Sequence, residues 1–476
     1  MKKLFKIIGI SLLTVLILLI AAPFLFQNQI KESVKTFLND SVNAQIDFED
    51  VSLSLFSSFP QANVTVQNLK IVNQQTFEGE TFAAVKSISF DMSVKELFKN
   101  ESEGPIVVNS IQIDEAILTI KSDKYGNKNY DIAKETEDTS TESDTNFKLN
   151  IEDYALRNSS VTYIDETSNT VVNISALNHS GKGNFSTDLS ELNTTTEALV
   201  SFSVDNTNYL NANSVKLDAL IALDLIENKY TFKENKFFIN QLALEFDGFV
   251  KLLEAGSEVD ITFKNTGSTF KEFLAVIPET YSKDIEGVTT TGSFKVEGFV
   301  KGLVTETHIP KMDIKMVSNN ASFKYPSLPK SVEDISINAS IKNDSGNMDD
   351  TYVSIRDLQF RIDQDVFKSS ATLKNLTKNM LVDATVDGTL NLANISKAYP
   401  VELDTELSGT LNAKLHTVFD MNAIETNAYE RTQNNGTIAI SDFVFSSEEL
   451  VNPIHISKVD VEFKPGLVML QSFVAT

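Results

Sequence analysis

Apolar and polar side chains alternate with a period of two residues over most of the chain after Asp47. This period puts successive side chains on opposite faces of a β-strand, so each strand has one apolar and one polar face. The alternation is clearest at residues 51–55, 335–341, 382–386 and 459–463. We therefore predict an all-β protein whose strands form a long sheet with one apolar face.

After Asp47, helical periodicity is found chiefly in two short segments, at residues 270–281 and 392–399. Each segment contains or ends beside a proline, Pro278 or Pro400, and proline interrupts the hydrogen bonding of a helix. We predict that the chain after Asp47 forms only a few short helices and consists mainly of strands.

The start of the chain contains an uncharged run at residues 7–26. A helix of that length spans roughly 30 Å, the thickness of the hydrocarbon core of a bilayer. Lys2, Lys3 and Lys6 precede the run and, by the positive-inside rule, keep the N-terminus in the cytoplasm. A cleaved signal peptide is the alternative, but its apolar region is normally shorter and ends at small residues. We predict that residues 1–29 form a transmembrane anchor with a short cytoplasmic N-terminus.

The chain after this anchor divides into segments of different composition. Apolar residues at helical spacing predict an amphipathic helix at residues 30–46, followed by a first β-groove section at 47–134. Residues 135–146 have no apolar side chain and predict an acidic, flexible linker. Residues 147–476 are predicted to form a second, repeating β-groove section. Because an apolar run at 467–470 lies close to the last residue, we expect the repeat to continue beyond this sequence; an exposed last strand is the alternative.

One short pattern recurs along the chain: an apolar residue, two mostly polar residues, an apolar residue, any residue, and an apolar residue. It is found at residues 66–71, 108–113, 239–244, 355–360, 440–445 and 456–461. The three-residue step breaks strict alternation. One extra residue, as in a β-bulge, lets both sides of the step face the same way, so we predict bulges at these positions.

Longer similarities indicate a repeat of about 120 residues. Residues 239–244 resemble 355–360, which lie 116 positions later. A helical segment followed by Gly292 resembles a second helical segment followed by Gly409, 117 positions later. Residues 323–325 resemble 443–445 at an offset of 120. We predict a repeat unit of several strands and one short helix, stacked into a long curved β-groove.

Motifs that would bring catalytic groups together are missing from the sequence. It contains no zincin, phosphate-loop, dinucleotide-binding, nucleophile-elbow or EF-hand motif. It has no Cys, and its 4 His are spaced too widely in the sequence to suggest a metal site. A Ser-x-x-Lys string at 327–330 and an oxygen-rich segment at 343–350 are better explained as turns. We predict that the protein is not an enzyme and binds neither a cofactor nor a metal ion.

The formal net charge of the chain is −24, and no basic stripe interrupts the acidic residues. A surface of this charge repels phosphate backbones, so we expect no nucleic acid among its partners. The acidity is best explained as a soluble, self-repelling outer surface.

The apolar face of such a long sheet has to be covered or has to bind something apolar. A second sheet or helices could cover it, but the sequence predicts few helices. If the sheet curls instead, its apolar face lines a trough suited to lipid acyl chains. From alternation, the groove-lining residues are Val64, Val66, Ile111, Ile113, Phe294, Val296, Ile337, Ala339, Ile341, Val382, Ala384 and Val386.

The same residues carry a family resemblance. The anchor, the short helix, and residues 53–60 leading into 64–71 resemble the start of AsmA-family proteins. The apolar strand at 111–120, followed by Tyr-Gly-Asn at 125–127, is similar to a strand and turn of the same family. Segments 270–304, 323–330 and 436–463 resemble the form found in Bacteroidetes-type bacteria.

The resemblance implies a single-pass inner-membrane protein with a periplasmic repeating β-groove, related to TamB and to bridge-like lipid-transfer proteins. It implies phospholipid transport to the outer membrane, or support of outer-membrane assembly. The implied partners are phospholipid acyl chains, the inner membrane and outer-membrane assembly proteins. A membrane-tethered scaffold or regulator of outer-membrane protein assembly, with no lipid transport, is the alternative. The resemblance assigns no catalytic residue.

Overall fold

The structure is a computed structural model, and it confirms that the fold is all-β. It describes residues 42–55, 61–98, 106–132, 147–183, 188–205, 207–253, 255–274, 276, 287–305, 307–376, 378–400, 408–445 and 453–476. Within these ranges there are 22 strands and only short helices. The chain separates into two compact units, which we describe one at a time. Unit 1 comprises Met1–Ile226 with Lys233–Asn235, and unit 2 comprises Glu227–Phe232 with Lys236–Thr476.

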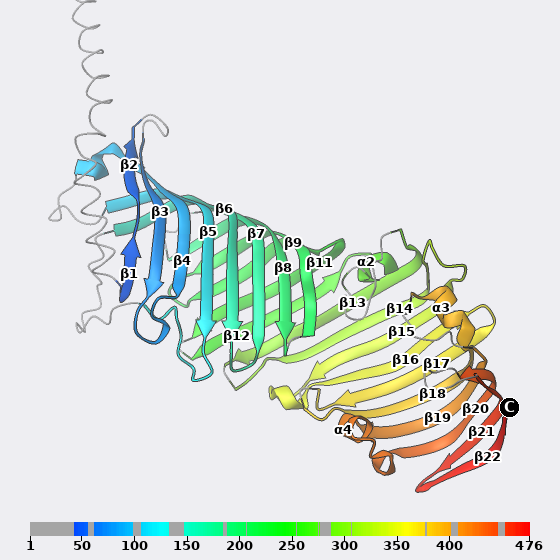
Figure 1. Cartoon of the computed structure of the whole chain (residues 1–476). Helices are drawn as coiled ribbons and strands as arrows, with labels where there is room; N and C mark the ends of the chain where they lie inside the picture. The colour runs from blue at the N-terminus through cyan, green and yellow to red at the C-terminus, as the bar shows by residue number, and fades with distance from the viewer. Residues whose placement is uncertain are drawn as a thin grey trace, which may run out of the picture. The chain divides into compact units, whose positions relative to one another are not determined.

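Unit 1 is an open sheet in which sequence neighbours pair. Its strands are β1 (Ala44–Asp47), β2 (Asp50–Ser54), β3 (Gln61–Asn73), β4 (Thr81–Ser93), β5 (Ile106–Ser122), β6 (Phe147–Asp165), β7 (Thr170–Gly183), β8 (Leu189–Val204) and β9 (Thr207–Asp224). The short helices η1 (Gln75–Phe77) and η2 (Val94–Phe98) flank β4. Both β1 and β2 pair with β3, and the later pairs are antiparallel except β5–β6, which is parallel (Figure 1).

The core of unit 1 lies on one face of β2, β3 and β4. Val51, Val64 and Val66 are almost fully buried there. Val42 and Val94 pack against this cluster from the first described residues and from η2. The predicted alternation therefore holds in β3, where buried and less buried residues succeed each other up to Val66.

Several strands of unit 1 contain a residue in the left-handed conformation. Positive φ angles occur at Asn68 in β3, Glu115 in β5, Asn158 in β6 and Ala176 in β7. Such kinks locally increase the twist of a strand and bend the sheet. The pairing register between β3 and β6 places the first three in one line across the sheet.

Unit 2 is an open, curved antiparallel sheet in which each strand pairs with the next (Figure 1). Its strands are β10 (Lys229–Ile239), of which Lys233–Asn235 belong to unit 1, and β11 (Leu242–Leu253), β12 (Gly256–Asn265), β13 (Thr289–Val304), β14 (Lys311–Lys324), β15 (Val332–Asn343), β16 (Tyr352–Ile362), β17 (Asp365–Lys374), β18 (Leu381–Asn391), β19 (Thr410–Asp420), β20 (Gln433–Phe445), β21 (Ile454–Lys464) and β22 (Leu467–Ala475). Its short helices are α2 (Phe270–Leu274), η4 (Met348–Asp350), η5 (Leu392–Asn394), α3 (Ile395–Ala398), α4 (Met421–Glu425) and η6 (Tyr429–Arg431).

Two of the three long-range similarities correspond to equivalent structures. The helix α2 precedes β13 and the helix α3 precedes β19, six strands later. Gly292 and Gly409 lie close to the starts of these strands with φ of 89° and 88°, a conformation that favours glycine. Residues 323 and 443 lie in β14 and β20, again six strands apart. The third similarity does not correspond to equivalent structures, because residues 239–242 form the turn from β10 to β11 whereas residues 355–358 lie inside β16.

The three-residue steps are irregular points of the sheet, as predicted, with one exception. Left-handed residues occur within the steps at 66–71 and 440–445, at Asn68 and Asp442. The pairing register shifts at the steps that start at 108, 355 and 456. The step at 239–244 is instead a two-residue hairpin turn with Asn240 at φ 53°.

Three predicted segments fall wholly or partly outside the described residues. The anchor at 1–29 and the acidic linker at 135–146 both lie outside them. Most of the helix predicted at 30–46 does too, but its last residues were assigned wrongly, because Ala44–Asp47 is β1. Ala44 and Ile46 are buried and alternate with exposed residues, which is the period of a strand. Among the described residues, no helix is long and apolar enough to cross a membrane.

Candidate functional site

The pairing register of unit 2 puts eight of the predicted groove residues on one face of its sheet. Residues directly opposite each other on neighbouring strands share a face. One transverse row from β13 to β18 contains Val296, Met316, Ala339, Ile355, Ala371 and Ala384. A second row contains Phe294, Ser318, Ile337, Leu358, Ser369 and Val386. A third row contains Ile314, Ile341, Val353, Leu373, Val382 and Phe419.

The other face of the same strands is polar. In β18, Asp383 and Thr385 are exposed, whereas Val382 is buried and Ala384 and Val386 are half-buried. Ion pairs such as Lys342–Asp313, with 3.1 Å between Nζ and Oδ2, cross the polar face between neighbouring strands. A shallow hollow of about 390 Å³ on this face is lined largely by charged side chains, including Glu245, Lys264 and others. The polar face therefore resembles an ordinary solvated surface.

Short helices cover part of the apolar face. Phe270 of α2 is 2% exposed, and the ring of Phe273 stacks on Phe294 of β13 with 4.0 Å between centroids. Ala398 of α3 is fully buried against the same cluster as Phe270. Phe294 and Val296 are consequently buried beneath or beside α2. By contrast, Ala384 and Val386 belong to neither of the buried clusters that α2 and α3 join.

An apolar pocket of about 440 Å³ lies between these helices and the sheet. Its floor is formed by β14, β15, β16 and β18, through residues that include Ile337 and Leu358. Its walls are α2, through Phe270, Phe273 and Leu274, and α3 with the following Tyr399. Every lining side chain is aliphatic or aromatic.

Hydrogen bonds hold both helices in place. Thr269 and Glu272 form a reciprocal cap at the start of α2: the Thr269 N–H donates to Glu272 Oε2 at 3.1 Å, and the Glu272 N–H donates to Thr269 Oγ1 at 3.4 Å. At α3, the N–H of Lys330 donates to the carbonyl oxygen of Lys397 at 3.0 Å. The Phe294 N–H of β13 donates to the Ser268 carbonyl oxygen at 3.0 Å, so α2 is tied to β13, and α3 is tied to the segment that precedes β15.

The four groove residues predicted in unit 1 also share a face, in two adjacent rows. Val64 and Ile111 each lie opposite Phe90 of β4, and Val66 and Ile113 each lie opposite Ile88. Val64 and Val66 are core residues with 5% and 3% exposure, and Ile111 and Ile113 pack against that core. In this unit the face is therefore filled by the protein's own side chains at β3.

Farther along the sheet of unit 1, the same face becomes polar. The Tyr154 hydroxyl lies 2.7 Å from His179 Nε2, and His179 Nδ1 lies 2.8 Å from Thr196 Oγ1. A Cβ at Gly181 would lie 2.5 Å from the Tyr154 ring, so glycine makes room for that ring. Burial lowers the pKa of His179 and raises the pKa of Tyr154, which favours the neutral form of both.

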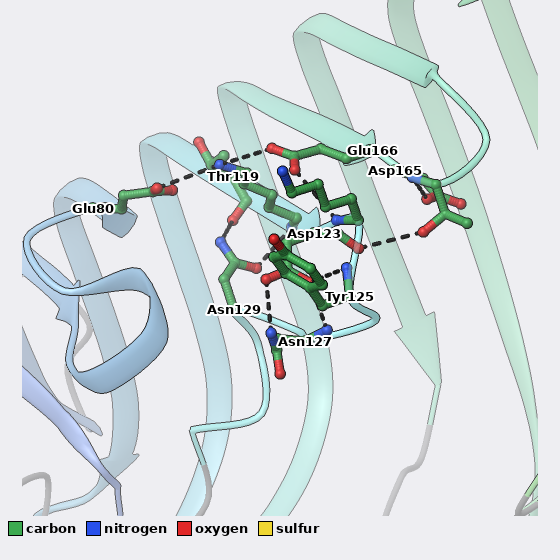
Figure 2. Close-up of polar contacts among 11 residues, drawn as sticks. Glu80, Thr119, Asp123, Tyr125, Asn127, Asn129, Asp165 and Glu166 are labelled. Carbon is green, nitrogen blue, oxygen red and sulfur yellow. Dashed lines mark hydrogen bonds and ion pairs between the residues drawn. The ribbon is translucent and has the colours of Figure 1, made fainter.

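A tight turn after β5 organises one end of unit 1 (Figure 2). Asp123 Oδ1 accepts hydrogen bonds from the N–H groups of Tyr125 and Asn127 at 2.8 and 2.9 Å. Its Oδ2 accepts from Asn127 Nδ2 at 2.7 Å. The Asn127 amide lowers the pKa of the Asp123 carboxyl through these bonds, despite the opposing effect of burial. Gly126, between these partners, has φ of 83°.

Asn129 connects this turn to two other strands and is 1% exposed (Figure 2). Its Oδ1 accepts from the Lys121 N–H at 2.7 Å, and its Nδ2 donates to the Thr119 carbonyl oxygen at 2.8 Å. Its own carbonyl oxygen accepts from Asn73 Nδ2 at the end of β3. The turn therefore fixes the chain where it leaves β5, before it returns to start the parallel strand β6.

Lys121 joins the same cluster through two carboxylates. Its Nζ lies 3.3 Å from Glu80 Oε1 and 3.3 Å from Glu166 Oε1. Burial alone would lower the pKa of Lys121, but the hydrogen bonds and charges of Glu166 and Glu80 raise it overall. These groups bond to one another within the protein, apart from Asn73 Oδ1, which is buried without a hydrogen-bond partner, and the cluster is a structural clamp.

The other polar candidates in the sequence form turns. The Leu328 N–H donates to the Tyr325 carbonyl oxygen at 3.2 Å, within a turn that contains the Ser-x-x-Lys string. Asn343 is fully buried and donates from Nδ2 to Asn347 and Thr351, which closes the oxygen-rich segment on itself. No group of three or more His, Cys, Asp or Glu side chains suited to a metal ion is found among the described residues.

Two features of these faces were not foreseen from the sequence. The pocket depends on α2 and α3, which lie far apart in the chain, and no local pattern brings them together. The contact between Tyr154 and His179 joins neighbouring strands, and both residues lie in the apolar phase of the alternation. A polar residue in that phase is the signal that could have indicated it.

A family model described as the AsmA family matches residues 1–274, which is more than half of the chain. No curated protein and no solved structure matches the chain.

Proposed function

Since this chain belongs to the AsmA family, and since its described strands form open sheets with an apolar face, we propose that it is a lipid-conducting groove protein. It holds phospholipid acyl chains against the apolar face of unit 2 and supports phospholipid transport to, or assembly of, the outer membrane. The observation that carries this proposal is the largely apolar face from β13 to β19, with Ser318 and Ser369 as the polar members of its three rows, together with the wholly apolar pocket over β14 to β18.

Energetics favour an apolar guest on this face. Burying one CH₂ group of an acyl chain contributes about 0.8 kcal/mol. Water on the same surface finds no hydrogen-bond partner among the aliphatic side chains in the rows that contain Ala384 and Val382. The phospholipid headgroup would stay near the edge of the sheet or in solvent, since neither charged nor amide side chains line the pocket.

The proposed location is the inner membrane, with the bulk of the chain in the periplasm. The uncharged run at 7–26 and the preceding Lys2, Lys3 and Lys6 support an anchor with its N-terminus in the cytoplasm. A reporter that is active only in the cytoplasm, fused after Thr476, should be silent. Strong reporter activity would contradict the orientation.

Replacement of Val386 by Asp tests the groove. The carboxylate would lie among acyl chains, where an unpaired charge costs several kcal/mol or shifts its pKa until it is neutral. We expect the lipid that copurifies with the full chain, measured by mass spectrometry, to fall by about tenfold, equivalent to about 1.4 kcal/mol.

Thr385→Asp is the matched control, because Thr385 is the adjacent residue of β18 and is exposed on the polar face. It should leave both the lipid content and the circular dichroism spectrum unchanged. If the wild-type protein carries no lipid, or if Val386→Asp keeps its lipid while folded, the conduit is contradicted. The scaffold for outer-membrane assembly would then be the better explanation.

A further inference from the structure

We propose that the pocket between α2 and α3 is a discrete binding site for the methyl end of a single phospholipid acyl chain. This site deepens the proposed function and rests on it, since it assumes that lipid reaches the apolar face of unit 2. The short helices then act as partitions, so that lipid occupies defined positions on the face and does not slide freely along it.

The first argument is that the helices α2 and α3 lie over the sheet and bound the pocket on two sides. Phe273 of α2 stacks on Phe294 of β13, and Ile395 of α3 packs in the same cluster as Leu390 of β18. The floor strands β14, β15 and β16 lie between these two contacts in the order of the sheet. The pocket is therefore bounded by α2 on the side of β13 and by α3 on the side of β18.

The second argument is the chemistry of the lining. Floor and walls consist of Phe, Leu, Ile and Val side chains together with Tyr399. At the rim, Tyr325 and Tyr399 meet edge to face with 5.8 Å between ring centroids. Apart from the Tyr399 hydroxyl, such a surface offers only apolar contacts, which match a hydrocarbon chain better than a phosphate or an amine.

The third argument is size. The pocket has a volume of about 440 Å³, within the range of roughly 300–1,000 Å³ that is usual for small-ligand sites. A cavity of this size with an apolar lining takes up apolar ligands more readily than water. It suits one acyl chain rather than a whole phospholipid.

The fourth argument is the repetition of the wall. The helices α2 and α3 each precede a strand that has a left-handed glycine close to its start, Gly292 for β13 and Gly409 for β19. Six strands, β13 to β18, lie between the two helices in chain order, yet Phe270 and Ala398 belong to one buried cluster, so helices of two successive repeats meet at the pocket. A partition at each repeat gives one acyl-chain site per repeat.

Filling the pocket tests this site. Leu358 lines the floor on β16, and Leu358→Trp would occupy the space of the ligand. The matched control is Asp357→Trp, because Asp357 is the adjacent residue of the same strand, is exposed, and lies opposite Asn338 on the polar face, outside the pocket lining. Leu358→Phe provides a milder filling variant in case the tryptophan prevents folding, which circular dichroism would reveal.

The probe is phosphatidylethanolamine with a diazirine near the methyl end of one acyl chain, added to the detergent-solubilised full chain. After irradiation, mass spectrometry locates the adducts by residue. We expect adducts in the wild type to concentrate at α2, α3 and β16, and Leu358→Trp to reduce them by about tenfold or more. Asp357→Trp should leave them unchanged.

Two results would overturn the proposal, and they differ in what else they affect. Adducts spread evenly over the apolar face and insensitive to Leu358→Trp would eliminate the discrete site but leave the conduit intact. No adduct anywhere in unit 2, together with a wild-type protein free of lipid, would contradict both the site and the proposed function.

Discussion

The apolar faces of the two units arise from the same alternation but have different surroundings. In unit 1, Val51 and Val66 are 1% and 3% exposed, because Val42, Val94 and other apolar side chains pack on them. In unit 2, Ala384 and Val386 remain half-buried, and the pocket beside α3 is open enough to accept a guest. A period of two thus predicts an apolar face, but the packing above that face decides whether it is core or binding surface.

The polar groups of the two units differ as well. Unit 1 has Tyr154, His179 and Thr196 in hydrogen-bond contact on its otherwise apolar face, and a clamp around Asn129 at one end. The rows of unit 2 that contain Ala339 and Val382 have no such chain among their described members. The polar contacts of unit 1 link neighbouring strands, whereas the face of unit 2 that is proposed to bind lipid is mainly apolar.

The largest effect expected from a single substitution is at Asn129, where the comparison predicts loss of stability in unit 1 alone. Asn129→Ala leaves the Lys121 N–H and the Thr119 carbonyl oxygen without their partner. Each buried unpaired group costs about 1–3 kcal/mol, so we expect the free energy of unfolding of unit 1 to fall by about 3 kcal/mol. Hydrogen exchange should accelerate in β3, β5 and β6 but not in the strands of unit 2.

The control for that variant is Asn127→Ala in the same turn. Asn127 is exposed and donates from its side chain only to Asp123 in the described contacts. We expect a loss below about 1 kcal/mol. If Asn129→Ala accelerated hydrogen exchange equally in both units, the prediction that it destabilises unit 1 alone would be contradicted.

A smaller effect is expected at the glycines that mark the repeat in unit 2. A Cβ at Gly409 would lie 2.5 Å from the Ser441 carbonyl oxygen, and a Cβ at Gly292 would lie 2.6 Å from the Ala321 Cα. With φ near 88–89° at both positions, each Gly→Ala variant should lose about 2 kcal/mol. Thermal unfolding followed by circular dichroism measures the change.

Gly466 provides the comparison for these two variants. It has φ of 72° but no atom within 4 Å of an added Cβ, so Gly466→Ala carries only the conformational cost of about 1 kcal/mol. If all three variants behave alike, close packing at the repeated glycines is not what holds the start of β13 and β19.

The smallest effect concerns pH and the polar chain of unit 1. Burial lowers the pKa of His179 in the folded protein, so the unfolded chain binds the proton more readily. The stabilising contribution is therefore present above the ordinary pKa of histidine and is lost as the pH falls through that value towards the folded pKa. Acidification from pH 7 to pH 5 should lower the unfolding midpoint by about 2 °C or less from this source.

His179→Gln should remove that part of the pH dependence, since glutamine does not titrate. His416→Gln is the matched control, because His416 is exposed on unit 2 beside Asp383. An unchanged pH dependence in His179→Gln would show that the polar chain does not respond to protonation.

The sequence predicted much of the sheet and little of what lies on it. Alternation alone predicted the face on which Val382, Asp383 and Ala384 lie, because the side-chain direction in a strand depends only on local geometry. The three-residue step correctly predicted an irregularity in the strand at Asp442, but at Asn240 the predicted bulge is a hairpin turn. Asparagine accepts a positive φ both in bulges and in two-residue turns. Short polar pairs between apolar residues do not distinguish the two structures.

The pocket could not be predicted from such patterns. Phe270 and Ala398 belong to one cluster although more than a hundred residues separate them. Only the curvature and the register of β13 to β18 bring them together, and neither is encoded in a local window. The burial of Val64 and Val66 was missed for the same reason, since the residues packed on them come from elsewhere in the chain.

The central claim is that the apolar face of unit 2 holds lipid and that its polar face does not. A photoreactive benzoylphenylalanine at Ala384 and, separately, at Asp383 tests it, because these adjacent residues of β18 lie on opposite faces. The full chain is irradiated in its native membrane, purified, and analysed by mass spectrometry for added lipid. We expect a phospholipid adduct at position 384 and none at 383; adducts of equal yield at both positions, or none at 384, would contradict the account.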